Sequence, residues 1–557
     1  MPVRMELRED SGRKLLKTHT HRLQIDIFTV NFRSRMPDEK ADFAIGDGST
    51  PLHVCAVVCA PYVCSCHGCF THCRPSRIRF IIDRTHNPRL TVPTQIAALG
   101  WQPDSIQASR TLRGSVNLAI GSAFTLLPIC LSCVAGTLGL VLLYAVLLAS
   151  VLLSARLQPC DKGAEWQKAA VCDLDAPRMA ALTRLRATLM LQTIFCILAV
   201  DFPLLPRSLA KTRTFGHSVM DLGVGAFVLM GTLTRHRAGQ STSVSHSPTS
   251  TPRASPLVWR VLSRHGPLLA LGLGRLAAVR AVEYHSSHSE YGVHWNFFFT
   301  LSGVAVAESL LAPSVDDPAD TCATAKKAST FGRRRRHPWK GSVLGALVLM
   351  AHQWALSYGG LSEFVLHAPR TSFVSANKEG LGSLPGFLGI ALMGSAFRDL
   401  LRPRGSLEAW RAALRQLAAL DVGLWALALA ADALVQPASR RLCNLAYALW
   451  VLAQVLLALL GCLLVSLRCP LVMSPLLETT NRSPLSAFLL ANVLTGLVNL
   501  TIPTMHASSA ISTVILVVYM STVVSALYFV GSWNMSSTLG SLRDSFMGLT
   551  ISRNRKK

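Results

Sequence analysis

Long apolar runs alternate with short polar connections along most of this 557-residue chain. A helix that crosses a bilayer needs about 20 predominantly apolar residues, and such runs recur from residue 115 onward. They predict twelve spanning helices, at 115–136, 137–155, 187–205, 216–234, 264–282, 293–313, 341–359, 383–400, 414–435, 445–467, 485–503 and 508–530. The first two form one continuous run, which is too long for a single crossing. We therefore predict an all-α fold, a multi-pass transmembrane helical bundle.

Composition supports the same fold class. Half of the residues are hydrophobic, only 15% are charged, and the mean hydropathy is +0.37. Soluble domains usually carry about 25% charged residues and fewer uninterrupted apolar runs. The composition therefore argues against a string of soluble domains.

The formal net charge of +25 raises the question of nucleic-acid binding, and the distribution of that charge answers it. Lys and Arg are densest in alternate connections, as expected for loops that stay in the cytoplasm. The clusters lie at 235–260, 326–340, 402–411 and 553–557. All four fall on one side if the twelve spans are right, and they lack the interleaved aromatic residues of single-strand binders. The charge therefore predicts topology, with a cytoplasmic C-terminus and no nucleic-acid partner.

Five connections remain for the opposite side of the membrane. They are 206–215, 283–292, 360–382, 436–444 and 504–507. Three of them carry unusually polar sequences. The charge rule also has exceptions on this side, namely Arg207, Lys211, Arg213, Arg440 and Arg441.

The same pattern divides the chain into three parts. Residues 1–114 are polar, lack helical periodicity and hold six of the fifteen cysteines. We interpret them as a poorly structured, cysteine-rich extension, either a degenerate first span or an error in the gene model. The cysteine spacing does not repeat as paired C-x-x-C motifs, which argues against a zinc site. Residues 115–530 form the membrane domain, and 531–557 form a basic cytoplasmic tail.

Candidate chemistry begins in the segment from Ala199 to Gly225. Asp201 closes one predicted span, Lys211 follows ten residues later, and Asp221 lies about one turn inside the next span. Carboxylates at membrane depth are costly and usually face a partner or a polar cavity. The alternative is a simple ion pair between Asp201 and Lys211 that ties two helix ends together. The residues alone leave both interpretations open.

A second polar segment contains SEYGVHWNFFF. Its candidates are Arg275, Arg280, Glu290, Tyr291, His294, Trp295 and Asn296. Tyr291 and Trp295 are also explained as aromatic anchors at a membrane boundary. His294 and Asn296 point in different directions on a helix of 3.6 residues per turn, so we expect part of this group to face a polar interior.

Two further segments contribute amide and amine side chains. RTSFVSANKEG holds Asn377 and Lys378 before a turn signal at Gly380, and a solvated loop is an equally good interpretation of it. LLANVLTGLVNL places Asn492 and Asn499 on one helix face. Small and amide residues in that pattern often support helix packing in lipid, so we favour packing over substrate contact there.

These four segments together resemble a known family. EYGVHWNFFFT, AVDFPLLPRSLAK with MDLGVG, ANKEG and FLLANVLTGLVNL resemble, in order and spacing, the signature regions of the GPI-anchor inositol acyltransferases, class W of the phosphatidylinositol-glycan pathway. The resemblance implies a multi-pass enzyme of the endoplasmic reticulum with its motif loops in the lumen. It implies transfer of a fatty acyl group, usually palmitoyl, from acyl-CoA to the inositol ring of glucosaminyl-phosphatidylinositol. The family has one more span near the amino terminus, so twelve or thirteen spans are expected.

The implied reaction needs a base for the attacking hydroxyl and a positive group for the developing oxyanion. From the family's motif positions we predict Asp201 as the base and Lys211 as its electrostatic partner, with His294 as the alternative base. The substrate-binding candidates are Asp221, Arg275, Arg280, Glu290, Tyr291, Trp295, Asn296, Asn377, Lys378, Asn492 and Asn499.

Acyl-CoA is expected as a co-substrate, beside membrane lipid, and neither a metal nor a tightly bound cofactor is expected. The sequence has no G-x-S-x-G elbow, which favours direct transfer over an acyl-enzyme intermediate. The main alternative function is a polytopic lipid or solute transporter or flippase.

Overall fold

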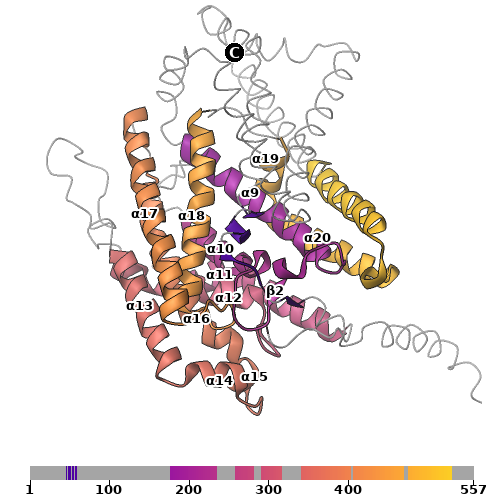
Figure 1. Cartoon of the computed structure of the whole chain (residues 1–557), viewed down its shortest axis with the longest axis horizontal. Helices are drawn as coiled ribbons and strands as arrows, with labels where there is room; N and C mark the ends of the chain where they lie inside the picture. Colours follow the sequence, from indigo (N-terminus) through magenta and orange to yellow (C-terminus); the bar gives the residue numbers. More distant parts are fainter. Residues whose placement is uncertain are drawn as a thin grey trace, which may run out of the picture.

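The fold is an all-α bundle of long helices, seen from the side in Figure 1. The computed structural model describes residues 45–46, 48–51, 53–55, 57–58, 176–234, 257–281, 290–315, 340–402, 406–468 and 475–529. The long helices are α9 (Ala176–Ala199), α10 (Val219–Thr234), α11 (Leu257–Ala281), α12 (Phe297–Val315), α13 (Lys340–Ser357), α16 (Lys378–Leu400), α17 (Leu407–Leu434), α18 (Leu445–Arg468), α20 (Pro484–Thr501) and a last helix, Ser509–Phe529.

Each of these ten helices coincides with one of the twelve predicted spans. The predicted spans 115–136 and 137–155 lie outside the described residues. Six of the described helices are both long and apolar enough to cross a membrane, and α10 and part of α12 are shorter apolar helices. The prediction of a multi-pass transmembrane bundle is confirmed.

Four helices, α9, α11, α16 and α17, begin five or more residues earlier than their predicted apolar runs. α9 starts at Ala176 rather than near 187, because its first turns carry polar residues that an apolar-length criterion passes over. One of them, Arg184, is buried and donates to Ser466 Oγ in α18 at 2.5 Å. α16 likewise starts at Lys378 rather than at 383, since its first residues are polar but buried.

Short elements lie between the long helices. They are β1 (Ile45–Gly46), η1 (Arg207–Leu209), β2 (Lys211–Thr212), α14 (Leu361–His367), α15 (Phe373–Ala376), α19 (Pro475–Arg482) and η3 (Thr504–His506). β1 and β2 pair in parallel over two residues. This pairing involves residues within the predicted N-terminal extension; the three-part division of the chain stays a prediction.

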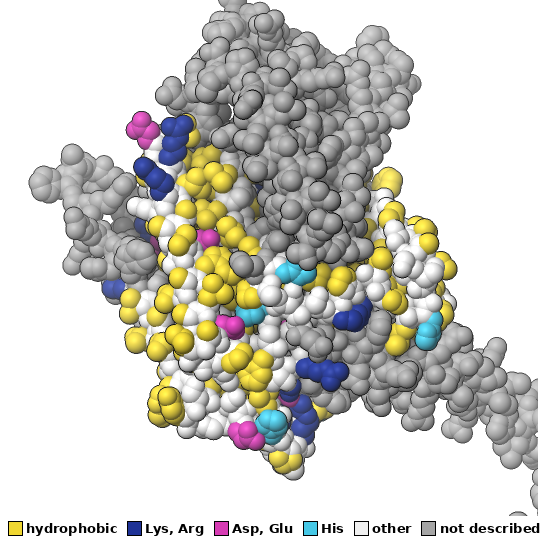
Figure 2. Space-filling model, viewed as in Figure 1, with side chains coloured by type: hydrophobic (Ala, Val, Ile, Leu, Met, Phe, Trp, Pro, Cys, Tyr) yellow, Lys and Arg dark blue, Asp and Glu magenta, His cyan; other side chains and the backbone are white. Residues whose placement is uncertain are grey.

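The core is centred on α18, which packs against α9, α10, α16 and α17. Tyr447 and Trp450 of α18 are among the largest fully buried side chains, with Trp410 of α17 and Phe387 of α16. On the outer flank of α17 the side chains are exposed and apolar, including Val422 and Leu434. Figure 2 shows this hydrophobic flank, with charged side chains gathered at its upper end and around α14 and α15 below. Such an apolar belt between polar ends is typical of a helix facing lipid.

α16 approaches its neighbours through glycine. A Cβ on Gly386 would lie 2.1 Å from the carbonyl oxygen of Cys443, and one on Gly389 would lie 2.5 Å from Leu349 Cγ. Small residues at helix interfaces let backbones approach closely in membrane proteins. The close packing of α16 therefore depends on these two positions.

Gly386→Val should destabilise the protein, because overpacking a tight interface costs about 1–3 kcal/mol. The measurement is the midpoint of thermal unfolding of the purified protein in detergent. Gly423→Val is the matched control, since Gly423 lies in α17 with nothing within 4 Å of the added Cβ position. Equal midpoints for the two variants would contradict the packing argument.

Candidate functional site

The loops that the charge pattern assigns to one side of the membrane meet at one end of the bundle. Gly216 N donates to Ala438 O at 2.8 Å, which joins the α9–α10 loop to the α17–α18 turn. Gly380 N donates to Tyr291 O at 2.9 Å, which joins the start of α16 to the segment before α12. The amide of Asn499, at the end of α20, donates to Asp201 Oδ2 at 2.7 Å. The candidate residues of separate sequence segments therefore lie at a common end.

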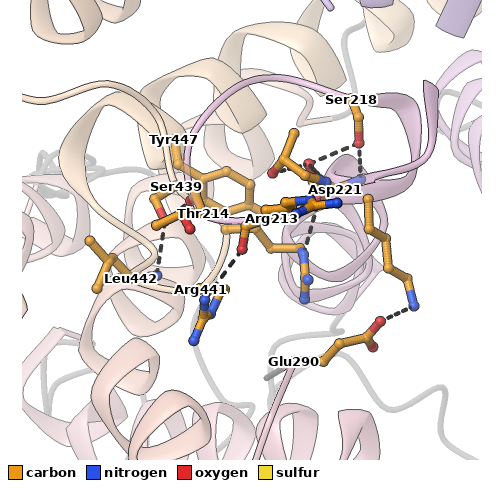
Figure 3. Close-up of polar contacts among 12 residues, drawn as sticks. Arg213, Thr214, Ser218, Asp221, Glu290, Ser439, Arg441, Leu442 and Tyr447 are labelled. Atoms are coloured by element: carbon orange, nitrogen blue, oxygen red, sulfur yellow. Dashed lines mark hydrogen bonds and ion pairs between the residues drawn. The ribbon is translucent and has the colours of Figure 1, made fainter. Parts of the chain in front are cut away.

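Asp221 is the centre of a buried polar cluster at this end (Figure 3). Its Oδ2 accepts hydrogen bonds from Thr212 N at 3.1 Å, from Thr212 Oγ1 at 2.8 Å and from Ser218 Oγ at 2.8 Å. Its Oδ1 lies 2.8 Å from Arg440 Nε, and its carbonyl oxygen accepts from the Tyr447 hydroxyl at 2.7 Å. We call Thr212, Ser218, Asp221, Arg440 and Tyr447 the Asp221 cluster.

This geometry places Asp221 inside a network of hydrogen bonds and an ion pair, and the substrate contact predicted for it stays a prediction. Both carboxylate oxygens are engaged and the side chain is buried. Burial alone would lower the pKa of Arg440, but Asp221 and Glu290 together raise it. Arg440 therefore stays charged and neutralises the buried carboxylate.

Three of the four arginines that break the charge rule have partners for their side chains within the protein. Arg207 donates to the carbonyl oxygens of Val200, Phe202 and Leu205, which closes the end of α9. Arg440 belongs to the Asp221 cluster, and Arg441 Nη2 lies 3.4 Å from Glu379 Oε1. These cations serve the fold, so they do not contradict the predicted topology.

A second ion-pair group surrounds Glu379, whose side chain is fully buried. Arg370 reaches both of its oxygens, at 2.5 Å and 3.0 Å. Burial lowers the pKa of Arg441, and Glu379 only partly offsets that effect. The neighbouring Lys378 is 4% exposed and donates to Ala368 O at 2.5 Å. Lys378 thus closes a loop and is not presented to solvent.

The sequence predicted Lys211 as the electrostatic partner of Asp201, but in the structure Lys211 pairs with Glu290. Lys211 Nζ lies 2.5 Å from Glu290 Oε1, and both side chains are partly exposed, at 33% and 26%. Burial acts to raise the pKa of Glu290, but Lys211, Arg440 and Arg275 lower it to about 2. The pair therefore holds an ionised carboxylate and an amine at the rim of the loops.

Asp201 is half-buried where α9 ends. Its carboxylate accepts the hydrogen bond from Asn499 and lies near the Arg207 guanidinium. Burial lowers the pKa of Arg207, and the negative charge of Asp201 partly opposes that effect. Asp201 and Lys211 are thus carried by the same α9–α10 loop, Glu290 reaches Lys211 from the segment before α12, and Asn499 of α20 orients the Asp201 carboxylate.

The segment before α12 is held by its own polar atoms. Asn296 Oδ1 accepts from Phe298 N and Phe299 N, which caps α12, and its amide donates to Gly272 O. Trp295 donates to Thr300 Oγ1 at 3.0 Å. Gly292 has φ +116, and a Cβ there would lie 2.6 Å from Asn377 Cα. Asn296 is therefore a capping residue, and Trp295 packs against Phe299 of α12 and Gly380 of α16.

His294 and Tyr291 remain near this rim. The His294 ring stacks on Phe373 at 6.2 Å, and its backbone N–H donates to Asn377 Oδ1 at 2.8 Å. Asn377 also donates to Phe373 O and is fully buried. Burial raises the pKa of Tyr291 to about 12, so its hydroxyl stays protonated at neutral pH.

The remaining candidates lie in α11 and α20. Arg275 is exposed, and its charge contributes to the lowered pKa of Glu290. Arg280 has a described backbone in α11, but its side chain lies outside the described residues. Asn492 is exposed and donates to Phe488 O of its own helix. Asn492 and Asn499 therefore differ in environment, and Asn499 alone of the two reaches the site.

Sequence reasoning missed Thr212, Glu379, Arg440 and Arg441 as members of this end of the bundle. Arg440 and Arg441 had a signal, because they break the charge rule in a loop on the predicted motif side. Glu379 follows the chosen Lys378 directly and was passed over. Among the residues that the structure describes, no group of three or more His, Cys, Asp or Glu side chains is arranged to hold a metal ion.

Comparison with known proteins gives matches along most of the chain. A family model described as GWT1 matches residues 44–530. An uncharacterised protein of Arabidopsis thaliana is 36% identical over 361 residues, which are 63% of this chain and 74% of that protein. The phosphatidylinositol-glycan biosynthesis class W protein of Dictyostelium discoideum is 31% identical over 385 residues, covering 63% and 74%. The GPI-anchored wall transfer protein 1 of Schizosaccharomyces pombe is 34% identical over 362 residues, covering 62% and 70%.

Removing Arg440 should destabilise the fold strongly. Arg440→Leu leaves the buried Asp221 charge without its partner, and breaking such a pair costs about 3–5 kcal/mol. The measurement is the free energy of unfolding by denaturant titration in mixed micelles. Asp221→Asn in the same protein should recover part of the loss, because it removes the uncompensated charge. Arg213→Ala, at an exposed residue of the neighbouring α9–α10 loop, is the control and should change stability by no more than about 0.5 kcal/mol.

The contribution of the Lys211–Glu290 pair should be independent of pH through the neutral range. The folded pKa of Glu290, about 2, lies below the ordinary value of about 4.3. Its stabilisation is therefore present above about pH 4.5 and lost as the pH falls toward 2. The difference in thermal midpoint between the wild type and Glu290→Gln should be constant from about pH 8 to pH 5 and shrink below about pH 4.5. A difference that disappears between pH 7 and pH 5 would refute the assignment.

Proposed function

The chain belongs to the GWT1 family, and on that premise we propose that it transfers a fatty acyl group to the inositol ring of glucosaminyl-phosphatidylinositol in GPI-anchor biosynthesis. The relatives in Dictyostelium discoideum and Schizosaccharomyces pombe carry names from GPI biology, which supports this assignment over the transporter alternative. The proposed donor is acyl-CoA, with palmitoyl as the expected chain. The proposed site is the endoplasmic-reticulum membrane, with the motif loops lumenal and the C-terminus cytoplasmic.

One observation carries the proposal. Asp201, oriented by Asn499, and Lys211, paired with Glu290, stand in the same loop at the end of a membrane bundle. A carboxylate and an amine at one site are the two groups that acyl transfer to a hydroxyl requires. The apolar helices below them suit the fatty chains of both substrates.

The proposed reaction is direct transfer. The inositol hydroxyl oxygen bonds to the acyl carbon, the carbon–sulfur bond of the thioester breaks, and CoA leaves as a thiol with the hydroxyl proton. Asp201 takes that proton during the attack, and Lys211 stabilises the negative charge that develops on the thioester oxygen. Glu290 acts as a positioning residue, because it holds the Lys211 amine. His294 is the alternative base.

Phosphate recognition falls to the exposed cations of the same end. Arg275 and Arg213 are exposed, and guanidinium groups suit phosphate oxygens. Lys378 is not proposed for this role, because it is buried and bonded to Ala368 O. Asp221, Trp295, Asn296 and Asn377 support the site through the contacts described above.

Asp201→Asn should lower the rate of acyl transfer by about 10²- to 10⁴-fold, because general-base catalysis contributes an effect of that size. The assay uses purified full-length protein, glucosaminyl-phosphatidylinositol and labelled acyl-CoA. Asp399→Asn is the control, since Asp399 pairs with Arg402 at the other end of α16. Full activity of Asp201→Asn at equal protein abundance would exclude the base assignment, and a wild type without acyl transfer would exclude the proposed function.

A further inference from the structure

The segment around β1 lies against the loop that carries Lys211. Ile45 pairs with Lys211 and Gly46 pairs with Thr212 in parallel register. Ser49 forms an antiparallel bridge with His217, and its N–H donates to His217 O at 2.6 Å. The loop is therefore bonded to residues 45–49 at two places.

Thr212 is enclosed from both sides. Gly48 has φ +87, and a Cβ there would lie 2.9 Å from Thr212 Cγ2 and 3.2 Å from His217 O. On its other side, Thr212 donates to Asp221 from both its backbone N–H and its hydroxyl. Only a residue without a side chain fits at Gly48 while the loop stays in place.

The described residues that follow, 50–51, 53–55 and 57–58, anchor this segment to the bundle. Val54 and Val57 are fully buried, and Val58 is nearly so. The Gln192 amide of α9 donates to Val57 O at 3.3 Å and to Val58 O at 3.4 Å. Thr50 begins this turn, since its carbonyl oxygen accepts from Val54 N. The segment is therefore fixed relative to α9, and its pairing with the loop that carries Lys211 fixes that loop as well.

We infer that residues 45–49 form a positioning element for the Lys211 amine, with Gly48 as the residue on which its fit depends. The inference rests on the proposed function of Lys211. The backbone of Lys211 is held by β1, that of Thr212 by Asp221, and the amine itself by Glu290. An oxyanion donor acts only when it is fixed close to its productive place, and a displacement of about 1 Å can cost about 10²-fold in rate.

The test compares Gly48→Ala with Gly223→Ala in the full chain. Gly223 lies in α10, two residues from Asp221, with nothing within 4 Å of the added Cβ position. Gly48→Ala should lower kcat by about tenfold or more and leave KM for acyl-CoA unchanged, because the amine is displaced but the acyl chain site is not. Gly223→Ala should retain the wild-type kcat. Adding Thr212→Ser to Gly48→Ala removes the clashing methyl group, keeps the hydroxyl for Asp221, and should restore part of kcat.

A second measurement does not depend on catalysis. The wild type and Gly48→Ala are treated with an amine-acylating reagent, and labelling of each lysine is followed by mass spectrometry. Lys211 should be labelled several times faster in Gly48→Ala, because its pairing with Glu290 is loosened, whereas the exposed Lys340 should not change. Wild-type kcat together with wild-type labelling at Lys211 would overturn the inference. Failure of the proposed role of Lys211 is a separate result, seen as full acyl transfer by Lys211→Ala, and failure of the proposed function is seen as a wild type without acyl transfer.

Discussion

The buried ion pair between Asp221 and Arg440 is the constraint on which this end of the bundle depends. Two charges removed from water are tolerated only when each is paired and its remaining hydrogen-bonding capacity is used. Asp221 meets that condition through Thr212, Ser218 and Arg440, and its carbonyl oxygen through Tyr447. Asp221 itself lies in α10, and its partners come from β2, the residue before α10, the α17–α18 turn and α18, so satisfying this one residue fixes four parts of the chain relative to one another.

Burial divides the polar side chains at this end of the bundle into two groups. Asp221, Glu379, Asn296, Asn377 and Lys378 are buried, with their polar atoms bonded within the protein. The groups left at the rim are Asp201, His294, Arg275 and the Lys211–Glu290 pair. The polar motifs of this protein therefore contain both buried side chains that hold the fold together and side chains at the rim. Residue type alone does not distinguish the two kinds, but burial does. The polarity of the segment before α12 has a physical explanation: Asn296 caps α12, and the backbone of Tyr291 and His294 joins the segment to α16 and its N-cap residue.

The helical bundle could be predicted from the sequence, because the length of an apolar run is a local property of the chain. Every predicted span within the described residues became a helix, and the charge bias identified the loops that meet at one end. The ion-pair partners of charged residues could not be predicted in the same way. Lys211 lies ten residues from Asp201, yet its partner is Glu290, 79 residues away. Nothing in the local pattern of Lys211 distinguishes two carboxylates, because the choice depends on how α9, α10 and α12 pack.

The fit of small residues and the first residues of helices also depend on tertiary packing, so the sequence did not predict them. Gly48 reads as an ordinary turn glycine, and its tight fit against Thr212 exists only once β1 and β2 are paired. The polar first turns of α9 and α16 were excluded from their predicted spans, because hydropathy records transfer to lipid and not burial against protein. Burial against protein is set by tertiary contacts such as that of Arg184 with Ser466.

The separation of Asp221 from Arg440 also sets an order of events during biosynthesis. A chain leaves the ribosome from its N-terminus, so Asp221 is made 219 residues before the guanidinium that neutralises it. Through that interval α10 is in or near the membrane with an uncompensated carboxylate, a state that is unfavourable in hydrocarbon. The nascent helix must stay at a hydrated surface, take up a proton, or be sheltered by the translocation machinery until α18 follows. A chain that ends before residue 440 would lack the cationic partner of this carboxylate altogether.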